Sequence, residues 1–380
     1  MKPLEGIVVL DFSQYLAGPS AALRLADLGA RVIKIERKGS GEANRALALK
    51  NKEIDGSSLL FHTINRNKES YAVDLKDAAD LEKVKKLIAK ADVLIENFRP
   101  GVMEKLHLDY QTVRKINERI VYGSVTGYGR VGPWKGKPGQ DLLVQAYSGL
   151  AYLNGNDDQP PVPFPLAIAD MFTGAHLVQG ILACLIRREK TNKGGFVETS
   201  LIESIIAVQF EVLTTHLNDG RQLPQRSRIN NAHAYLGAPY GVYETQDGYL
   251  SLAMGSITEL GEIVNCPELL TYEDPKSWFE KRDEIKLILL KHLRQEKTAY
   301  WLEKLDAAGY WSAEVLTWKE LFAHEGFQAL QMVQTVSPNS EKEMKTTRCP
   351  IRFNEELLIS SRGAPRVGEH NEQIEGDFQL

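Results

Sequence analysis

Short apolar runs separated by amphipathic stretches recur through the first half of the chain. Five of them, at residues 6–12, 31–36, 70–75, 92–98 and 120–125, have the length of buried parallel strands. A helix rich in alanine and leucine at 20–28, ended by Gly29, joins the first two. An amphipathic helix at 77–91 joins the third and fourth. This alternation predicts right-handed crossovers and an α/β fold with a Rossmann-like sheet.

A second pattern is a long apolar passage at residues 165–186 that contains one acid, Asp170. Four prolines between 160 and 165 favour a loop that enters a helix there. Asp170 is then near the helix start, where the macrodipole favours a negative charge. Local pattern favours an N-cap aspartate, and the alternative is an ionised nucleophile in a water-poor pocket. A strand at 196–200 and an apolar helix at 201–217 follow.

The second half of the chain has a different pattern. A change of composition at 218–226 indicates a linker, and a hairpin around Gln246-Asp247-Gly248 is followed by helices at 278–296 and 299–308. We predict a large Rossmann-like domain at 1–205, which includes a helix at 141–152, and a linker at 206–224. A small α+β domain at 225–330 comes next. A return segment at 331–380, which is loop-like at 349–353 and 363–370, is expected to pack back on the large domain.

Composition excludes several classes of protein. The 380 residues carry a net charge of −4, which gives no case for nucleic acid or a membrane surface. The three cysteines are far apart, so neither a disulfide framework nor a zinc site is indicated. The start lacks the apolar core of a signal peptide, and His176 and Gln179 interrupt the apolar passage. We expect a cytoplasmic protein without a metal.

Cationic residues follow three of the predicted strands: Arg37, Lys76 and Arg99. Ligands of open α/β sheets bind at the carboxyl ends of the strands, so three cations there favour a multiply charged ligand such as a phosphorylated nucleotide. The first turn has one glycine followed by proline, Gly18-Pro19, instead of the glycine pattern of a dinucleotide site. An NAD-dependent dehydrogenase is therefore disfavoured, and Glu36 is interpreted as a solvated strand end.

An ordered set of motifs extends nearly from end to end. It comprises Val9-Leu10-Asp11-Phe12, Ala17-Gly18-Pro19, Asp27-Leu28-Gly29-Ala30 with Val32-Ile33-Lys34-Ile35-Glu36, Gly39-Ser40-Gly41, Asn65-Arg66-Asn67-Lys68, Glu96-Asn97-Phe98-Arg99-Pro100-Gly101, Thr126-Gly127-Tyr128-Gly129, Asp170, and Gly363-Ala364-Pro365 with Gly368-Glu369-His370. With this set the chain resembles the class III CoA-transferases, which include formyl-CoA and carnitine CoA-transferases, and their relatives the α-methylacyl-CoA racemases.

The resemblance implies an interlaced homodimer in which a large and a small domain are joined by long linkers. It also implies coenzyme A or acyl-CoA and a small carboxylic acid as substrates, with no metal, NAD, nucleic acid or membrane partner. Asp170 matches the catalytic aspartate of the family. The residues expected to bind CoA are Leu16, Ala17, Arg37, Leu75, Lys76, Asn97, Phe98, Arg99, Lys105, Tyr128, Lys137 and Gln140.

The implied chemistry suits an ionised carboxylate. Asp170 attacks the thioester carbonyl and forms an aspartyl–acyl anhydride, and CoA thiolate then attacks the aspartyl carbonyl to give an aspartyl–CoA thioester. An acceptor acid reverses these steps. Each step passes through an oxyanion that needs hydrogen-bond donors, and exclusion of water protects the anhydride.

Several alternatives remain at this point. Racemases carry a histidine where Gln140 stands and a glutamate where Thr258 stands, and neither residue here can act as a base at neutral pH. Leu16 replaces a glutamine of formyl-CoA transferases, which favours an acid bulkier or more apolar than formate or oxalate. His233 and Tyr235 are either substrate contacts or solvated loop residues, and His370 has no assigned role. A CoA-binding protein without turnover is the remaining alternative.

Overall fold

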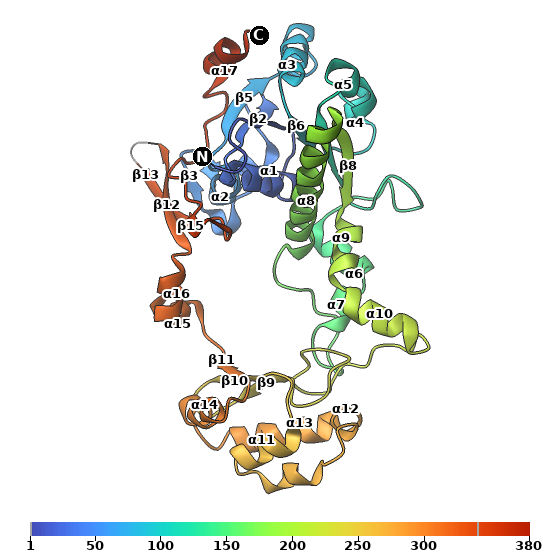
Figure 1. The fold of residues 1–380 in the computed structure, drawn as a ribbon, viewed down its shortest axis with the longest axis vertical. Helices are drawn as coiled ribbons and strands as arrows, with labels where there is room; N and C mark the ends of the chain where they lie inside the picture. The colour runs from blue at the N-terminus through green and yellow to red at the C-terminus, as the bar shows by residue number, and fades with distance from the viewer. Residues whose placement is uncertain (1, 340–341) are drawn as a thin grey trace. The chain divides into compact units, whose positions relative to one another are not determined.

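The computed structural model describes residues 2–339 and 342–380 (Figure 1). The chain forms two compact units. The first unit contains Met1–Val144, Ala167–Val208 and Ala329–Leu380, and the second contains Gln145–Leu166 and Gln209–Gln328. Residues 145–166, which the sequence analysis placed in the large domain, therefore group with the second unit.

A six-stranded parallel sheet forms the centre of the first unit. In sheet order its strands are β5 (Glu69–Val73), β2 (Arg31–Arg37), β1 (Val8–Asp11), β6 (Val93–Glu96), β7 (Val121–Thr126) and β8 (Gly195–Ser200). Counted along the sheet's own strands, this is the 3-2-1-4-5-6 order of doubly wound α/β proteins. Leu10 on β1 is opposite Ile33 on β2 and Leu94 on β6, and all three side chains are fully buried. The predicted parallel α/β sheet is confirmed.

Helices and short elements surround this sheet. They are α1 (Ala17–Asp27), η1 (Ala43–Ala46), η2 (Leu49–Asn51), β3 (Glu53–Ile54), β4 (Ser57–Ser58), α2 (Leu59–Asn65), α3 (Ala78–Ala89), α4 (Val102–Lys105), α5 (Tyr110–Ile116), α8 (Ile168–Thr191), α9 (Leu201–Val208) and α17 (Asn371–Phe378). The order of β1 and its neighbours creates a topological switch point between β1 and β6, because the chain leaves these adjacent strands toward opposite sides of the sheet.

The longest helix, α8, was expected to be too interrupted to match a membrane span, and this expectation is wrong. By length and composition its 24 residues could cross a membrane. Its inner face instead packs into the core of the first unit through Leu177, Ile181 and Leu185, against α1, β7 and β8. A core helix of a soluble protein has the same composition, so the apolar passage reflects burial of one face.

The second unit has its own core. It contains α7 (Leu150–Leu153), α10 (Phe210–Asn218), β9 (Gly241–Glu244), β10 (Tyr249–Leu252), α11 (Ile257–Ile263), η3 (Pro267–Thr271), α12 (Ser277–Glu280), α13 (Arg282–Leu293), α14 (Thr298–Ala307), β11 (Ser312–Glu314) and α15 (Trp318–Ala323). The strands form an antiparallel sheet in the order β11-β10-β9, covered by a cluster that includes Tyr243, Leu250 and Leu289. Two helices, α6 (Asp141–Tyr147) and α16 (Glu325–Leu330), cross the division between the units.

Several predicted helices are interrupted in the structure. The helix expected at 141–152 is two helices, α6 and α7, because Gly149 between them has a left-handed φ of 82°. The helix expected at 201–217 is α9 and α10, and the one expected at 278–296 is α12 and α13. Apolar periodicity alone did not reveal these breaks.

The loop-like interpretation holds for residues 363–370, whereas 349–353 ends in a short strand. The rest of the segment at 331–380 forms elements that were not predicted. The strands β12 (Val333–Asn339) and β13 (Lys342–Thr347) pair, as do β14 (Arg352–Phe353) and β15 (Glu356–Leu357), and α17 follows. This helix packs beside β5 and contributes Ile374 and Phe378 to the core of the first unit. The strands are short or largely polar, so they lack the hydrophobic signal from which strands are predicted.

Candidate active site

Asp170 lies in the first turn of α8, three positions after the N-cap. Ala167 is the N-cap and Asp170 is the third residue of the helix, so the N-cap interpretation is wrong although the position near the helix start is confirmed. The C-terminal end of α8 leads into β8, which runs parallel to β7. The start of α8 is therefore at the carboxyl edge of the sheet, where α1 also begins after β1.

Two polar groups contact Asp170. Its backbone N–H donates to Oδ2 of Asp141 at 3.1 Å, and its carboxylate accepts the backbone N–H of Ala17. Burial, and then the negative charge of Asp141, raise the pKa of Asp170 to about 7, while the Ala17 N–H acts in the opposite direction. A carboxyl group with this pKa changes its charge at neutral pH, which is typical of a functional site.

Gly174 permits the close approach of α1 and α8 that brings Ala17 to Asp170. A Cβ atom at Gly174 would be 2.4 Å from Oγ of Ser20 and 2.8 Å from the carbonyl oxygen of Ala17. Because that backbone oxygen cannot move away by changing a rotamer, only glycine fits here without shifting a helix. Gly174 is one turn after Asp170 on α8. The contact at Gly174 therefore also fixes where the Asp170 carboxylate lies relative to α1.

A second pair of glycines fixes the segment that carries Asp141. Gly127 follows β7 and Gly139 precedes α6, and a Cβ on either would be 2.5 Å from the Cα of the other. The two backbones are thus in direct contact at the base of the loop between them. This contact holds the start of α6, and with it Asp141, at the carboxyl end of β7.

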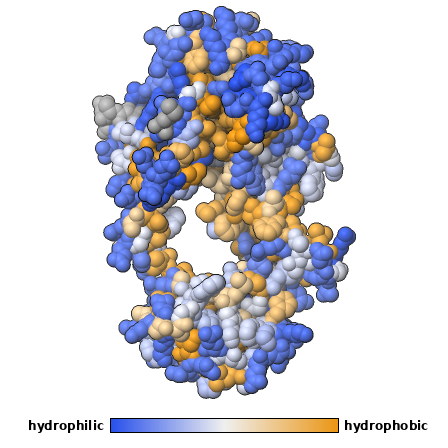
Figure 2. All heavy atoms as spheres, in the orientation of Figure 1, coloured by the Kyte–Doolittle hydropathy of each residue, from blue (hydrophilic) through white to orange (hydrophobic). Residues whose placement is uncertain are grey.

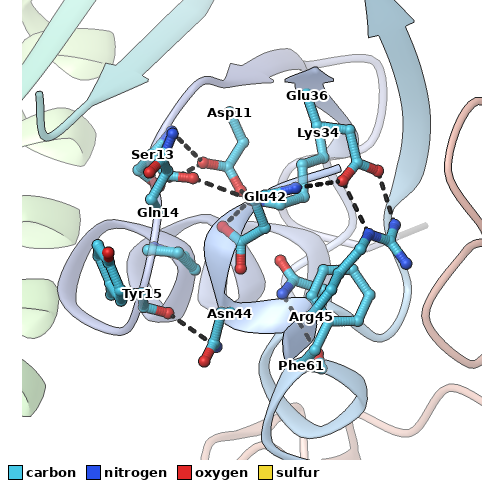
Figure 3. Close-up of polar contacts among 12 residues, drawn as sticks. Asp11, Ser13, Gln14, Tyr15, Lys34, Glu36, Glu42, Asn44, Arg45 and Phe61 are labelled. Atoms are coloured by element: carbon cyan, nitrogen blue, oxygen red, sulfur yellow. Dashed lines mark hydrogen bonds and ion pairs between the residues drawn. The ribbon is translucent and has the colours of Figure 1, made fainter. Parts of the chain in front are cut away.

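The turn before Ala17 is strained and held from two sides, and Figure 3 shows the side on which Asn44 bonds Tyr15. Tyr15 has a φ of 64°, a left-handed conformation that is costly for a residue with a side chain. Asn97, at the end of β6, accepts from the Gln14 N–H at 2.7 Å and donates to the Gln14 carbonyl at 2.6 Å. Asn44 donates to the Tyr15 carbonyl at 3.3 Å. These bonds over-determine the turn that presents the Ala17 N–H to Asp170.

A fully buried charge network lies beneath this turn (Figure 3). The Asp11 carboxylate accepts from Lys68 Nζ at 2.8 Å and from the Ser13 hydroxyl, and Lys34 Nζ is 3.7 Å from it. Lys34 also donates to the Ser13 carbonyl at 2.9 Å and pairs with Glu42 at 3.0 Å. Burial would raise the pKa of Asp11, but the charges of Lys34 and Lys68 lower it to about 2. Burial lowers the pKa of Lys68 to about 8.

Glu36 belongs to a neighbouring buried pair, so its interpretation as a solvated strand end is wrong. Its carboxylate accepts from Arg45 at 2.6 and 2.9 Å and from the Ser70 hydroxyl at 2.5 Å. The Arg45 guanidinium also lies over the ring of Phe61, 3.8 Å from its centroid. Burial would raise the pKa of Glu36, but Arg45 and Ser70 outweigh it and lower the pKa. Arg45 is nine residues and Ser70 34 residues from Glu36, and neither spacing follows the pattern of a strand.

The predicted CoA-binding residues divide into three groups in the structure. Arg37 ends β2, Lys76 follows β5 and Arg99 follows β6, so these exposed cations share the carboxyl edge of the sheet. Exposed Lys105 ends α4, and exposed Lys137 and Gln140 lie in the loop between β7 and α6. The remaining six are wholly or partly buried: Leu16, Ala17, Leu75, Asn97, Phe98 and Tyr128. Their contact with CoA stays a prediction.

A pocket of about 180 Å³ opens at the carboxyl ends of β6 and β7. Phe98 and Arg99 line it, together with Glu96, Arg130 and Phe196. Arg130 lies between carboxylates, 3.7 Å from Glu96 and 3.2 Å from Glu198, and its guanidinium is 5.2 Å from the centroid of Phe196. Burial raises the pKa of Glu96 despite its hydrogen bonds.

A single observation identifies the family. The model of CoA-transferase family III matches residues 4–371, nearly the whole chain. The chain belongs to CoA-transferase family III. The resemblance inferred from the motifs is therefore confirmed, and the parallel sheet with Asp170 at its carboxyl edge is the sheet of a family III CoA-transferase.

Two relatives and one solved structure show which proteins this chain is similar to. A succinyl-CoA:glutarate CoA-transferase of Mus musculus is 32% identical over 380 residues, which cover 98% of this chain and 86% of that protein. An acetyl-CoA:oxalate CoA-transferase of Acetobacter aceti is 35% identical over 316 residues, covering 81% of this chain and 79% of that protein. The crystal structure of a CAIB/BAIF family protein from Brucella suis superimposes with a TM-score of 0.84 at 31% identity and 99% coverage of both chains.

Two histidines considered in the sequence analysis, His370 and His233, contact other residues of the chain. His370 accepts from the Ser70 N–H at 3.3 Å and contacts Arg362 at 2.7 Å, so it anchors the end of the chain to β5. In the second unit, His233 pairs with Glu211 at 2.8 Å. In residues 2–339 and 342–380 there is no group of three histidine, cysteine or acidic side chains that could hold a metal ion.

Asp141 is the site residue whose role the sequence analysis missed. It appeared there only as the first residue of the helix expected at 141–152. Its contact with Asp170 joins positions 29 residues apart, and the two glycines that place it are 12 residues apart. The signal that could have found it is the motif Gly139-Gln140-Asp141 itself, which puts a carboxylate two residues after a glycine that has no room for a side chain.

Proposed function

We propose that this family III CoA-transferase moves CoA from an acyl-CoA to a free carboxylic acid with Asp170 as the nucleophile. The observation that carries the proposal is the Asp170 carboxyl at the start of α8, partly buried, bonded by the Ala17 N–H and with a pKa of about 7. Burial favours reaction in a water-poor environment, and a carboxylate of raised basicity is a stronger nucleophile than an exposed one.

The steps exchange one bond for another without hydrolysis. An Asp170 oxygen attacks the thioester carbon, the carbon–sulfur bond breaks, and CoA leaves as thiolate with the electron pair. The thiolate then attacks the aspartyl carbon of the anhydride, and the donor acid leaves as a carboxylate. The acceptor carboxylate enters by the reverse route. The Ala17 N–H, at the uncapped start of α1, is suited to stabilise the oxyanion on the aspartyl carbon.

The nucleotide of CoA is proposed to lie along the carboxyl edge of the sheet. Arg37, Lys76 and Arg99 supply positive charge there for its phosphates, and Lys105 and Lys137 extend it. Phe98 contributes an aromatic surface beside Arg99. The substrate acids are proposed to be short dicarboxylic acids larger than formate, because relatives are named for succinyl-CoA, glutarate and mesaconate.

The test combines turnover with detection of the intermediate. Purified wild-type protein, Asp170→Ala and, as a control, Asp306→Ala on the exposed surface of α14 are incubated with succinyl-CoA and either glutarate, mesaconate, oxalate or formate. We expect glutaryl- or mesaconyl-CoA to form with the wild type and the control, and the Asp170 variant to be slower by more than about 1,000-fold. Mass spectrometry should find CoA attached at Asp170. Transfer by Asp170→Ala at the wild-type rate would refute the proposed nucleophile.

A homodimer is proposed as the functional form. Met171 and Phe172 on α8 and Ile206 on α9 are 49%, 39% and 40% exposed, and Figure 2 shows hydrophobic side chains gathered in this part of the first unit. Large exposed apolar residues on neighbouring helices are typical of a surface covered by a partner. We expect light scattering after size exclusion to give twice the monomer mass at micromolar concentration. A monomer under these conditions would contradict the proposal.

A further inference from the structure

The first turn of α8 is capped by a side chain from another part of the chain. The N-cap residue Ala167 has no side-chain acceptor, so the free N–H groups of the turn need partners elsewhere. Asp141 supplies one by accepting the Asp170 N–H at 3.1 Å. Asp141 is only 8% exposed, so this hydrogen bond is shielded from solvent within the first unit.

The same Asp141 carboxylate provides the charge that Asp170 experiences. From α1 the polar contact with Asp170 is the Ala17 N–H, and no cationic side chain of the described residues acts on the Asp170 carboxyl. The other charged groups on elements that pack against α8 include Arg24 and Asp27 on α1, Glu198 on β8 and Glu203 on α9. None of these shifts the pKa of Asp170. His176, on α8 itself, does not act on it either.

We propose that Asp141 is a positioning residue for the nucleophile, which it serves by fixing the first turn of α8 through the Asp170 N–H and by placing a like charge beside the reacting carboxylate. The inference rests on the proposed role of Asp170. Two glycines, Gly127 and Gly139, hold the backbone that carries Asp141, so the spacing between the two acids is set by the fold.

The like charge has a chemical consequence. When Asp170 attacks a thioester, its negative charge leaves with CoA thiolate and the aspartyl group becomes neutral. Repulsion between Asp141 and Asp170 exists before this step and is absent after it. Asp141 therefore raises the energy of the free carboxylate relative to the acylated form and favours the covalent intermediate.

The test separates the charge of Asp141 from its hydrogen bond. Asp141→Asn keeps an oxygen that can accept the Asp170 N–H but removes the charge, and Asp141→Ala removes both. The matched control is Asp247→Asn, because exposed Asp247 accepts the Thr298 N–H at 2.9 Å at the start of α14 and does not act on Asp170. Each variant is assayed for CoA transfer between pH 5.5 and 9, for thermal unfolding, and for the fraction of protein that carries CoA on Asp170 at equilibrium.

We expect kcat/KM of the wild type and of Asp247→Asn to rise with pH through a midpoint at about 7. In Asp141→Asn the midpoint should fall by about one unit, and the equilibrium fraction of adduct should fall several-fold, with unfolding unchanged. Asp141→Ala should lose at least about tenfold more in kcat than Asp141→Asn, because the turn also loses its acceptor. If Asp141→Asn does not fold, Asp141→Ser carries the same test.

An unshifted midpoint in a folded, uncharged variant overturns the inference, even where kcat falls, because a purely structural cap leaves the protonation of Asp170 unchanged. The proposed function fails in a different way. If Asp170→Ala retains wild-type transfer, the nucleophile is another residue, whatever the Asp141 variants show.

Discussion

Two buried or partly buried aspartates of the first unit have opposite pKa shifts, which shows how single residues are controlled by their neighbours. Asp11 is completely buried, yet Lys34 and Lys68 hold its pKa at about 2. Asp170 has a carboxylate and one backbone N–H beside it, and its pKa is about 7. The first side chain stays ionised and structural, whereas the second can change charge near neutral pH. Burial acts in the same direction on both, so the neighbours make the difference.

Lys68→Met should destabilise the protein because it leaves the Asp11 carboxylate buried beside one lysine at 3.7 Å instead of two. We expect a loss of roughly 3 kcal/mol or more at pH 7, measured by denaturant unfolding. The pKa of Asp11 in the folded state is below its ordinary value of 3.8, so the stability it contributes is complete above that value and is lost as pH falls toward 2. The difference between variant and wild type should therefore shrink in acid.

The control for this change is Lys38→Met. Lys38 pairs with Asp80 at 2.8 Å, but its side chain is 59% exposed, and exposed pairs contribute at most about 1 kcal/mol. If Lys68→Met lowers the free energy of unfolding by as little as Lys38→Met does, the buried charge network does not stabilise the turn before Ala17.

At the scale of elements, the site depends on how closely α1 and α8 approach. Helix propensity favours alanine over glycine by about 1 kcal/mol in a helix interior, so Gly174 is a poor choice for α8 considered alone. The contact with the Ala17 carbonyl oxygen explains it, because a Cβ at 2.8 Å from a backbone oxygen cannot be accommodated by rotation of a side chain. Packing therefore overrides propensity at this position.

Gly174→Ala should lower both stability and activity. We expect a net loss of about 1–2 kcal/mol, because the clash outweighs the gain in propensity, together with a large fall in kcat as Asp170 moves away from the Ala17 N–H. Gly376→Ala in α17 is the matched control, since nothing lies within 4 Å of its added Cβ, and it should be neutral or stabilising. Thermal unfolding and CoA-transfer rates of the two variants measure the contrast. Equal effects of the two substitutions would mean that the close approach of α1 and α8 at Gly174 does not limit stability or activity.

At the scale of the whole molecule, the end of the chain completes the first unit. β5 is an edge strand of the sheet, and β2 pairs with only one side of it. On its outer side, a side chain from α17 bonds the backbone in place of another strand. Asn371 accepts from the Ala72 N–H at 2.8 Å and donates to the Ala72 carbonyl at 2.9 Å. Ile374 and Phe378 then bury against the same side of the core. The arrangement protects an edge that would otherwise be open to pairing with another chain.

Asn371→Ala removes both hydrogen bonds and leaves the edge of β5 without this partner. We expect a loss of about 1–3 kcal/mol in the free energy of unfolding, measured by chemical denaturation. Gln373→Ala, an exposed amide on the same helix, should change stability by less than about 0.5 kcal/mol. If the two variants are equally stable, the amide of Asn371 does not support the edge strand.

Much of the fold could be predicted because it follows from the local periodicity of apolar residues. The strands β1, β2, β5, β6 and β7 coincide with short, largely apolar runs, α3 has one apolar face, and their alternation leads to a parallel sheet. The position of Asp170 near a helix start followed from the prolines before it. Breaks at Gly149 and between α9 and α10 were not predicted, because apolar residues continue on both sides and only backbone conformation separates the helices.

The sequence by itself determined the parallel α/β sheet, the family of the chain and the identity of Asp170 as the candidate nucleophile, since each depends on residue types in a fixed order. Only the tertiary structure decided the surroundings of that carboxylate. Asp141, Ala17 and Gly174 come from three separate segments, and their effect on Asp170 depends on distances of a few ångströms that the order of residues does not contain. Charge and hydrogen bonding act over such distances, so the protonation of Asp170 is a property of the folded chain.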